Sequence, residues 1–333
     1  MSTGEVHEGG RTVVVVPTIR EDSIRAFVGA WAPFLRDAAL IVVEDNPERT
    51  FNLGAVQAGL EVEHVSWREI DQELGDRSWI IPRRTDCVRS FGFLRAARHR
   101  PDLVITLDDD CYPPLDGTDA IAEHRRALET AGRGEAWWPT TTGAPMRGVP
   151  YFNTSRERRV VVNHGLWSGN PDLDAPSQLV SHRHPVEFEA LTGMVPQGMY
   201  FPMCGMNMAM RPEVLPAAYF MLMGRDYEFD RFGDIWAGIL LKKICDHLGL
   251  GVTTGSPVID HRRASNVFAN LVKEAPGLKA NETFWEVVDN TVLTGRDFAS
   301  CYTELATALI PGEGYWERLG KAMHTWVELS SAA

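Results

Sequence analysis

The sequence has few cysteines, a deficit of basic charge and no long apolar run. Its five cysteines among 333 residues form no Cys-x-x-Cys pair, which argues against a disulfide framework and against a zinc site of that spacing. Lys and Arg number 33 against 45 Asp and Glu, and the net charge of -12 argues against a nucleic-acid backbone as partner. No stretch approaches the roughly 18 apolar residues of a transmembrane helix, and the N-terminus lacks the apolar core of a signal peptide. We therefore expect a soluble, cytoplasmic protein without a transmembrane segment or a nucleic-acid partner.

Glycine-rich phosphate loops are also missing. No G-x-x-x-x-G-K-[ST] run occurs, which excludes a Walker-type NTPase. Gly249-Leu250-Gly251 follows a predicted helix and precedes a predicted strand, the reverse of the Rossmann order, so this run is typical of a helix C-cap. A nucleotide would have to be bound through other groups.

Short apolar segments alternate with helical patterns in the first third of the chain, which predicts an α/β fold with βαβ units. The predicted strands of this part are 12–16, 40–43, 62–65 and 103–107. We divide the chain into a disordered tail (1–10), an α/β catalytic domain (11–280) and a helical C-terminal extension (281–333). The amphipathic extension suits packing or self-association, so a homo-oligomer is expected.

Three consecutive carboxylates, Asp108, Asp109 and Asp110, follow the apolar run Leu103–Leu107. In open α/β sheets, ligands bind at the carboxyl ends of strands, where this triplet would lie. A divalent cation would offset the repulsion among the carboxylates, and oxygen ligands suit Mg²⁺ or Mn²⁺ holding a substrate diphosphate. A solvated acidic turn that caps the next helix is the alternative. An aspartyl-nucleophile phosphatase fits poorly, because Tyr112 occupies its Thr/Val position.

Further candidates are scattered along the chain. Arg83, Arg84 and Arg89 open a predicted helix that runs to about residue 98, where they oppose the macrodipole, and an anionic ligand would explain them. Asp234 starts a later helix as a cap or as a catalytic carboxylate. His261 ends a predicted strand, where it is either structural or part of an Asp/His metal site. Phe201–Met208 reads as a buried strand with a glycine in close approach.

Several segments together resemble the reversibly glycosylated polypeptides, also called UDP-arabinopyranose mutases. The resemblance covers roughly residues 12–280, and a run such as Phe-Pro-Met-Cys-Gly-Met-Asn is specific. The similar segments are residues 15–20 (VVPTIR), 107–111 (LDDDC), 164–167 (HGLW), 171–176 (PDLDAP), 201–207 (FPMCGMN), 235–238 (IWAG), 244–249 (ICDHLG) and 264–266 (ASN).

The resemblance implies a glycosyltransferase-A type fold, in which a Rossmann-like mixed sheet is flanked by helices. It further implies a UDP-sugar substrate, a divalent cation, usually Mn²⁺, and interconversion of UDP-arabinopyranose and UDP-arabinofuranose. Self-glycosylation on an arginine is a family property, and Arg147 falls at the matching place. By the same mapping the expected metal ligands are Asp108, Asp110 and His261, and the expected catalytic residues are Arg147, Asp234 and Asp109. The expected UDP-sugar contacts are Thr18, Arg20, Asp45, Arg84, Asp108, His164, Trp167 and Asn207.

The sequence departs from the family pattern mainly around the sugar. One of the paired acids before the Trp-Ala-Gly run is replaced, which leaves Gly233-Asp234, and His261 is followed by two arginines. Two other functions therefore stay open. One is a glycosyltransferase that moves the sugar from a UDP-sugar to a small-molecule acceptor, and the other is a non-catalytic UDP-sugar-binding partner subunit.

Overall fold

The computed structural model describes residues 10–54, 56–130, 132–137, 147–152, 155–170, 172–181, 192–262 and 266–332. Within these residues a nine-stranded sheet forms the centre of the molecule, in the order β3-β2-β1-β4-β10-β8-β11-β5, with β9 paired to β11. Its strands are β1 (Thr12–Thr18), β2 (Ala38–Glu44), β3 (Glu61–Val65), β4 (Leu103–Leu107), β5 (Cys111–Tyr112), β8 (Val160–Gly169), β9 (Gly193–Met194), β10 (Asn207–Met210) and β11 (Gly251–His261). The predicted mixed α/β fold is confirmed.

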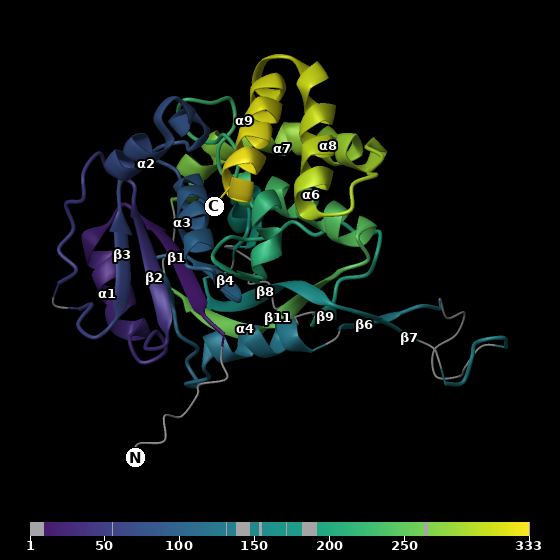
Figure 1. Cartoon of the computed structure of the whole chain (residues 1–333), viewed down its shortest axis with the longest axis horizontal. Helices are drawn as coiled ribbons and strands as arrows, with labels where there is room; N and C mark the ends of the chain where they lie inside the picture. The colour runs from purple at the N-terminus through teal and green to yellow at the C-terminus, as the bar shows by residue number, and fades with distance from the viewer. Residues whose placement is uncertain are drawn as a thin grey trace.

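Helices cover both faces of this sheet (Figure 1). The α-helices are α1 (Glu21–Trp31), α2 (Trp67–Leu74), α3 (Arg89–Arg98), α4 (Ala120–Glu129), α5 (Ala175–Ser181), α6 (Gly233–His247), α7 (Val267–Asn290), α8 (Phe298–Leu309) and α9 (Gly314–Ala332). The 3₁₀ helices are η1 (Gly75–Ile80), η2 (Asp86–Val88), η3 (Pro212–Ala217) and η4 (Ile310–Gly312).

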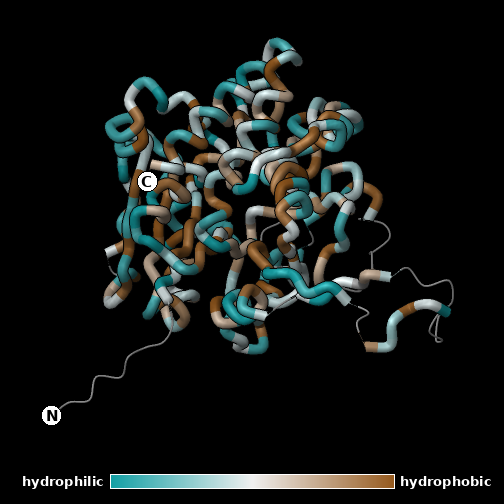
Figure 2. The backbone as a smooth tube through the Cα atoms, turned by 45° about the vertical axis from the view of Figure 1, so that its right-hand side comes forward, coloured by the Kyte–Doolittle hydropathy of each residue, from teal (hydrophilic) through white to brown (hydrophobic). Residues whose placement is uncertain are grey.

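Strand β1 explains why the sheet is buried on both sides. Every residue of β1 is buried, and alternate side chains enter two different cores. Val13 and Val15 pack with α3, α6 and the C-terminal helices, whereas Val14 and Val16 pack with α1 and α4. The hydropathy of the chain agrees with this arrangement, because apolar segments concentrate inside the body (Figure 2).

Strand direction decides where the functional residues lie. β1 is parallel to β2 and β4, while β10 is antiparallel to both β4 and β8. Strand β8 is therefore parallel to β4, and β11 is parallel to β8. The carboxyl ends of β1, β2, β4, β8 and β11 consequently meet at one edge of the sheet.

The C-terminal helices share the core of the α/β domain. Helix α7 spans residues 280 and 281, where the sequence analysis places a boundary. Trp236 of α6 stacks on Phe284 of α7 with ring centroids 4.8 Å apart, and Trp316 of α9 lies 5.4 Å from Trp236. The apolar faces of α8 and α9 are thus used within one chain, so the predicted self-association through them has no support from these faces.

A two-stranded ribbon extends from the body (Figure 1). It consists of β6 (Gly132–Glu135) and the antiparallel β7 (Ser155–Arg158). The described residues 147–152 lie beyond it, outside the body, and Tyr151 and Phe152 there are almost fully exposed (Figures 1 and 2). Residues 1–9 of the predicted tail lie outside the described residues.

Two predicted elements are wrong in extent. The helix expected from Arg83 begins only at Arg89, because Arg84 adopts a positive φ of 58° and a 3₁₀ turn intervenes. The strand expected over Phe201–Met208 begins at Asn207. Residues 201–206 instead form a loop at the functional edge.

The packing of α9 predicts that the C-terminal extension is integral to folding. Trp326 is fully buried, stacks on Tyr219 and donates from Nε1 to the Leu215 carbonyl at 3.1 Å. We expect Trp326→Ala to lower the free energy of unfolding by about 3–5 kcal/mol, measured by urea denaturation. Trp285→Ala, at a half-exposed tryptophan of α7, is the control and should cost about 1 kcal/mol or less. Equal losses in the two variants would contradict this role.

Candidate active site

The acidic triplet Asp108–Asp110 lies at the shared carboxyl edge of the sheet, directly after β4. The loop after β1 supplies its first partners. Thr18 Oγ1 donates to Asp109 Oδ2 at 2.6 Å, and Arg20 Nε donates to the same oxygen at 3.3 Å. Arg20 Nη2 also donates to Asp110 Oδ2 at 3.0 Å. The structure therefore brings together four residues that the sequence analysis predicted from separate segments.

Arg89 is the cation beneath the triplet, and its guanidinium is 1% exposed. It forms a hydrogen-bonded ion pair with Asp108. Its Nη1 donates to Thr106 Oγ1 at 2.8 Å and to the Gly205 carbonyl at 2.6 Å. A buried charge is tolerated when it is paired and hydrogen-bonded in this way. The sequence analysis noted Arg89 as a helix-end arginine and did not identify Asp108, 19 residues away, as its partner.

His261 and Asp110 fit a divalent cation. His261 Nδ1 lies 2.8 Å from the Asn170 carbonyl, so this nitrogen carries the proton and the lone pair of Nε2 faces Asp110 Oδ1 at 3.8 Å. Burial raises the pKa of Asp110, and the charges of Asp108 and Asp109 raise it further. A cation between the two donors would offset this repulsion.

The described residues contain no group of three or more His, Cys, Asp or Glu side chains placed to bind an ion by themselves. Asp110 and His261 would therefore supply two ligands, leaving the other positions to water and substrate oxygens, as Mg²⁺ sites commonly do. Asp108, the third predicted ligand, is engaged by Arg89, and its role as a ligand stays a prediction.

Asp45 and Arg84, two predicted uridine contacts, lie together beyond the end of β2. Asp45 is 4% exposed and accepts from Trp67 Nε1 at 2.7 Å and from the Thr85 backbone N–H at 2.8 Å. Burial raises the pKa of the Asp45 carboxyl, which these hydrogen bonds oppose. The Arg84 guanidinium lies over the Trp67 ring at 5.4 Å. This arrangement provides an aromatic face, a carboxylate and a cation for a planar, polar ligand.

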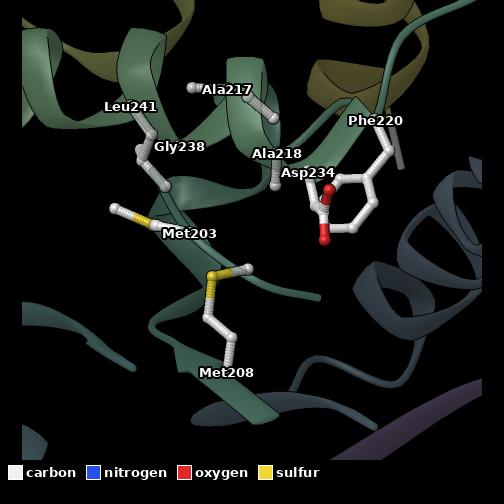
Figure 3. Close-up of a pocket in the computed structure, with 9 residues that line it drawn as sticks. Met203, Met208, Ala217, Ala218, Phe220, Asp234, Gly238 and Leu241 are labelled. Atoms are coloured by element: carbon white, nitrogen blue, oxygen red, sulfur yellow. The ribbon is translucent and has the colours of Figure 1, made fainter. Parts of the chain in front are cut away.

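Asp234 lies in the first turn of α6 and contacts the loop that precedes β10. The Gly205 backbone N–H donates to its Oδ2 at 2.9 Å. A cavity of about 10 Å³, lined by eight uncharged residues including Met203, Phe220 and Leu241, adjoins the carboxyl (Figure 3). Burial in this setting, together with the charges of Asp86 and Asp172, raises the pKa of Asp234 to about 7.

Asp172 is a site residue that the sequence analysis placed in a family-like segment without a role. It is exposed, and the Cys204 thiol hydrogen-bonds to it. Partial burial raises the pKa of the Asp172 carboxyl, and the negative charge of Asp108 raises it further. The Asp-Leu-Asp-Ala-Pro run was the only signal in the sequence, because Asp172 and Asp108 are far apart in the chain.

Three predicted UDP-sugar contacts lie beneath the edge. Asn207 is 1% exposed, and its amide bonds to His124, to the Leu166 carbonyl and to the Pro257 carbonyl. His164 is buried, and burial lowers its pKa to about 4. Within the described part of the chain, His164 Nδ1 and Trp167 Nε1 are buried without a hydrogen-bond partner. Direct contact of these three residues with a ligand stays a prediction.

Arg147 lies on the exposed segment beyond the β6–β7 ribbon. Among the hydrogen bonds and ion pairs of the described residues, none joins Arg147 to the acidic triplet. Its catalytic assignment likewise stays a prediction.

The sheet order, with β10 antiparallel between the parallel strands β4 and β8 and with acids at the carboxyl edge, is that of the predicted glycosyltransferase-A type fold. The family model described as "Reversibly glycosylated polypeptide" matches residues 8–333, so the chain belongs to this family. It is 36% identical to UDP-arabinopyranose mutase 1 of Arabidopsis thaliana, covering 95% of this chain and 90% of that protein. It is 35% identical to UDP-arabinopyranose mutase 1 of Oryza sativa subsp. japonica, covering 95% and 89%.

Solved structures are more distantly similar. A crystal structure of a mycobacterial protein matches with a TM-score of 0.44 and 16% identity, covering 81% of this chain and 74% of that one. Glucosyl-3-phosphoglycerate synthase from Mycobacterium tuberculosis, in complex with Mg²⁺ and uridine-diphosphate, matches with a TM-score of 0.41 and 15% identity, covering 90% and 79%. Separately, no helix among the described residues is long and apolar enough to cross a membrane.

The Asp234 carboxyl predicts a pH dependence of stability. Because its pKa is about 7 in the folded protein against an ordinary value of 3.8, the folded state binds more protons between these values, and stability falls as pH rises through them. Asp234→Asn removes this loss, since an amide has no charge to desolvate. We expect its stability advantage over the wild type to grow by roughly 2 kcal/mol from pH 5 to pH 8 in urea unfolding, at 1.36 kcal/mol per unit of pKa shift. Asp226→Asn, at an exposed position, should show no such growth. An Asp234→Asn variant whose advantage shrinks toward pH 8 would refute the shift.

Proposed function

We propose that the chain is a UDP-sugar mutase that interconverts UDP-arabinopyranose and UDP-arabinofuranose with Mn²⁺ or Mg²⁺. The observation that supports this most strongly is the edge where Asp108–Asp110, Arg20 and His261 converge, in a chain 36% identical to an Arabidopsis protein of that name. We further propose that the protein acts in the cytoplasm, as free cysteines suggest, and keep the homo-oligomer as a hypothesis.

The chain's own groups would divide the substrate between them. Asp45, Trp67 and Arg84 would hold the uridine through the carboxylate, the aromatic face and the cation. Arg20 would orient Asp109 and Asp110, both of which it already contacts, and Thr18 would fix Asp109. The diphosphate would then lie at the acidic edge with the sugar directed toward Asp234.

A divalent cation held by Asp110 and His261 would supply Lewis-acid chemistry, withdrawing charge from the diphosphate leaving group. Arg89 holds Asp108 beneath that position through their hydrogen-bonded ion pair. Asp234 and Asp172 flank the space beyond it, where charge develops on the sugar as the anomeric bond breaks. Positioning and electrostatics would supply most of the rate.

The direct test is incubation with UDP-arabinopyranose and Mn²⁺, with the nucleotide products resolved by chromatography. We expect a UDP-arabinofuranose peak that disappears with a chelator and returns when Mn²⁺ is restored. Asp110→Asn should reduce its rate by at least about a hundredfold, because a cation ligand is lost. Asp116→Asn, at an exposed turn beyond the triplet, is the matched control and should leave the rate unchanged.

Full turnover in Asp108→Asn and Asp110→Asn with Mn²⁺ present would contradict the assignment of the edge. Release of UDP that depends on an added small-molecule acceptor, without furanose product, would instead favour the glycosyltransferase. Tight UDP binding without turnover of any sugar nucleotide would favour the non-catalytic partner subunit.

Self-glycosylation is a separate part of this proposal. Arg147 is exposed, so its guanidinium is accessible to a sugar donor. We expect incubation with UDP-[¹⁴C]arabinopyranose to label the wild type and Arg147→Lys to lose the label, measured by gel autoradiography. Arg133→Lys, at an exposed arginine of the ribbon, is the control and should keep it. Undiminished labelling of Arg147→Lys would remove Arg147 from this role.

A further inference from the structure

Two carboxyl groups beyond the acidic triplet are held by consecutive residues of one loop. The Cys204 thiol hydrogen-bonds to the Asp172 carboxylate, and the Gly205 N–H donates to Asp234 Oδ2 at 2.9 Å. The Gly205 carbonyl accepts from Arg89 Nη1 at 2.6 Å, and Arg89 in turn pairs with Asp108. The Cys204-Gly205 loop therefore fixes both carboxyls relative to the edge where the diphosphate would lie.

This loop has little freedom to move. A Cβ at position 205 would lie 2.6 Å from the Phe220 ring and 2.9 Å from Arg89 Nη1, so only glycine fits there. The Cys204 backbone N–H donates to His164 Nε2 at 3.1 Å, which ties the loop to β8. Both carboxyls are consequently attached to a rigid support.

A buried carboxylate fixes the segment that carries Asp172. Glu274 of α7 is 4% exposed, and its Oε2 accepts from the Ala175 backbone N–H at 2.7 Å. Its Oε1 accepts from Arg231 Nε at 2.7 Å, so one side chain joins the start of α5, helix α7 and the loop before α6. The two hydrogen bonds of Glu274 thus hold the segment that carries Asp172 near Arg231.

The environments of the two carboxyls differ. Asp234 is partly buried beside a small cavity with a mainly apolar lining (Figure 3), which favours its protonated form. Asp172 is exposed, and the hydrogen bond that it accepts from the Cys204 thiol opposes the rise in the pKa of its carboxyl. The charged and titratable neighbours that act on Asp234 are Asp86, Asp172, Arg89, Arg231, Cys87 and Cys204. Those that act on Asp172 are Asp108, Asp234, Arg231, His261 and Cys204. An exposed carboxyl and a carboxyl beside an apolar cavity are suited to the roles of general base and general acid, respectively.

We propose that Asp172 and Asp234 are the acid–base pair that exchanges the ring oxygen of the bound pentose, with Asp172 as base and Asp234 as acid. This inference rests on the proposed mutase function and adds a catalytic residue, Asp172, to it.

The proton and electron pairs balance in this scheme. The anomeric C1–O bond breaks and its electron pair leaves with UDP. The O4 hydroxyl then bonds to C1 and gives its proton to the Asp172 carboxylate. The C1–O5 bond breaks, its pair goes to O5, and O5 takes the proton of Asp234. The β-phosphate of UDP finally rebonds to C1 of the five-membered ring. The turnover leaves Asp172 protonated and Asp234 ionised, and a proton passes from Asp172 to Asp234 through solvent before the next turnover.

The scheme separates anomeric bond cleavage from ring exchange, and an isotope experiment can measure the two independently. UDP-arabinopyranose is prepared with ¹⁸O in the bridge between C1 and the β-phosphorus. Each reversible cleavage lets this label move into a non-bridging position of the β-phosphate. Recovered UDP-arabinopyranose therefore reports cleavage, while UDP-arabinofuranose reports completed ring exchange.

With Mn²⁺ present, we expect Asp172→Asn to move the ¹⁸O label at a rate within about threefold of the wild-type rate. The rate of furanose formation should fall at least about a hundredfold in this variant, which is the usual scale of general base catalysis. Asp172→Glu should recover part of the furanose rate, because it keeps a carboxylate. Asp174→Asn is the matched control on the same exposed segment and should retain both rates. Melting temperature and UDP affinity of each variant show whether it is folded.

Three results would overturn the inference. These are undiminished furanose formation in Asp172→Asn, parallel loss of isotope exchange and furanose in that folded variant, and an equal loss in Asp174→Asn. If Asp172→Asn does not fold, Asp172→Glu decides, since furanose at the wild-type rate or an equal loss of both signals would refute the pairing. Failure of the proposed function looks different, because the wild type itself would then form no furanose.

Discussion

The buried ion pair between Arg89 and Asp108 is the interaction on which the site depends. Arg89 is enclosed by protein, and it reaches the acidic triplet, Thr106 of β4 and the Gly205 carbonyl at the same time. An uncompensated guanidinium at this depth would be strongly unfavourable, so the loops that carry its partners are held to one arrangement. The acidic triplet and the loop that contacts Asp172 and Asp234 are thereby connected through one side chain.

The direction of β10 explains how this connection arises. In a sheet of parallel strands only, the loops that follow the strands would supply every group at the functional edge. Because β10 runs antiparallel, the loop that precedes it, residues 201–206, also reaches that edge. This loop carries Cys204 and Gly205, which donate hydrogen bonds to Asp172 and Asp234, respectively. The reversed direction of β10 therefore completes the site.

The sequence predicted those features that depend on local pattern. Asp108–Asp110, Arg20, Asp45 and His261 each follow an apolar strand, and the parallel arrangement places them at one edge as expected. The partnership of Arg89 with Asp108 could not be predicted, since it depends on how α3 packs under β4. The strand predicted over Phe201–Met208 was too long for a similar reason. The apolar residues of this run do not show that Gly205 must lie close to Arg89. The hydrogen bond between Asn207 and His124 could not be predicted either, because a buried polar network leaves no periodic signal.

The place of β11 in the sheet has a consequence for the order in which the site forms during synthesis. The two-residue strand β5 directly follows the acidic triplet, and among the described residues it pairs only with β11. His261 is the last residue of β11. While residue 261 is still inside the ribosome, the acidic loop lacks both β11, the strand that pairs with β5, and the imidazole of His261. The carboxyl edge of the sheet is therefore completed late in translation, after most of the sheet has been made.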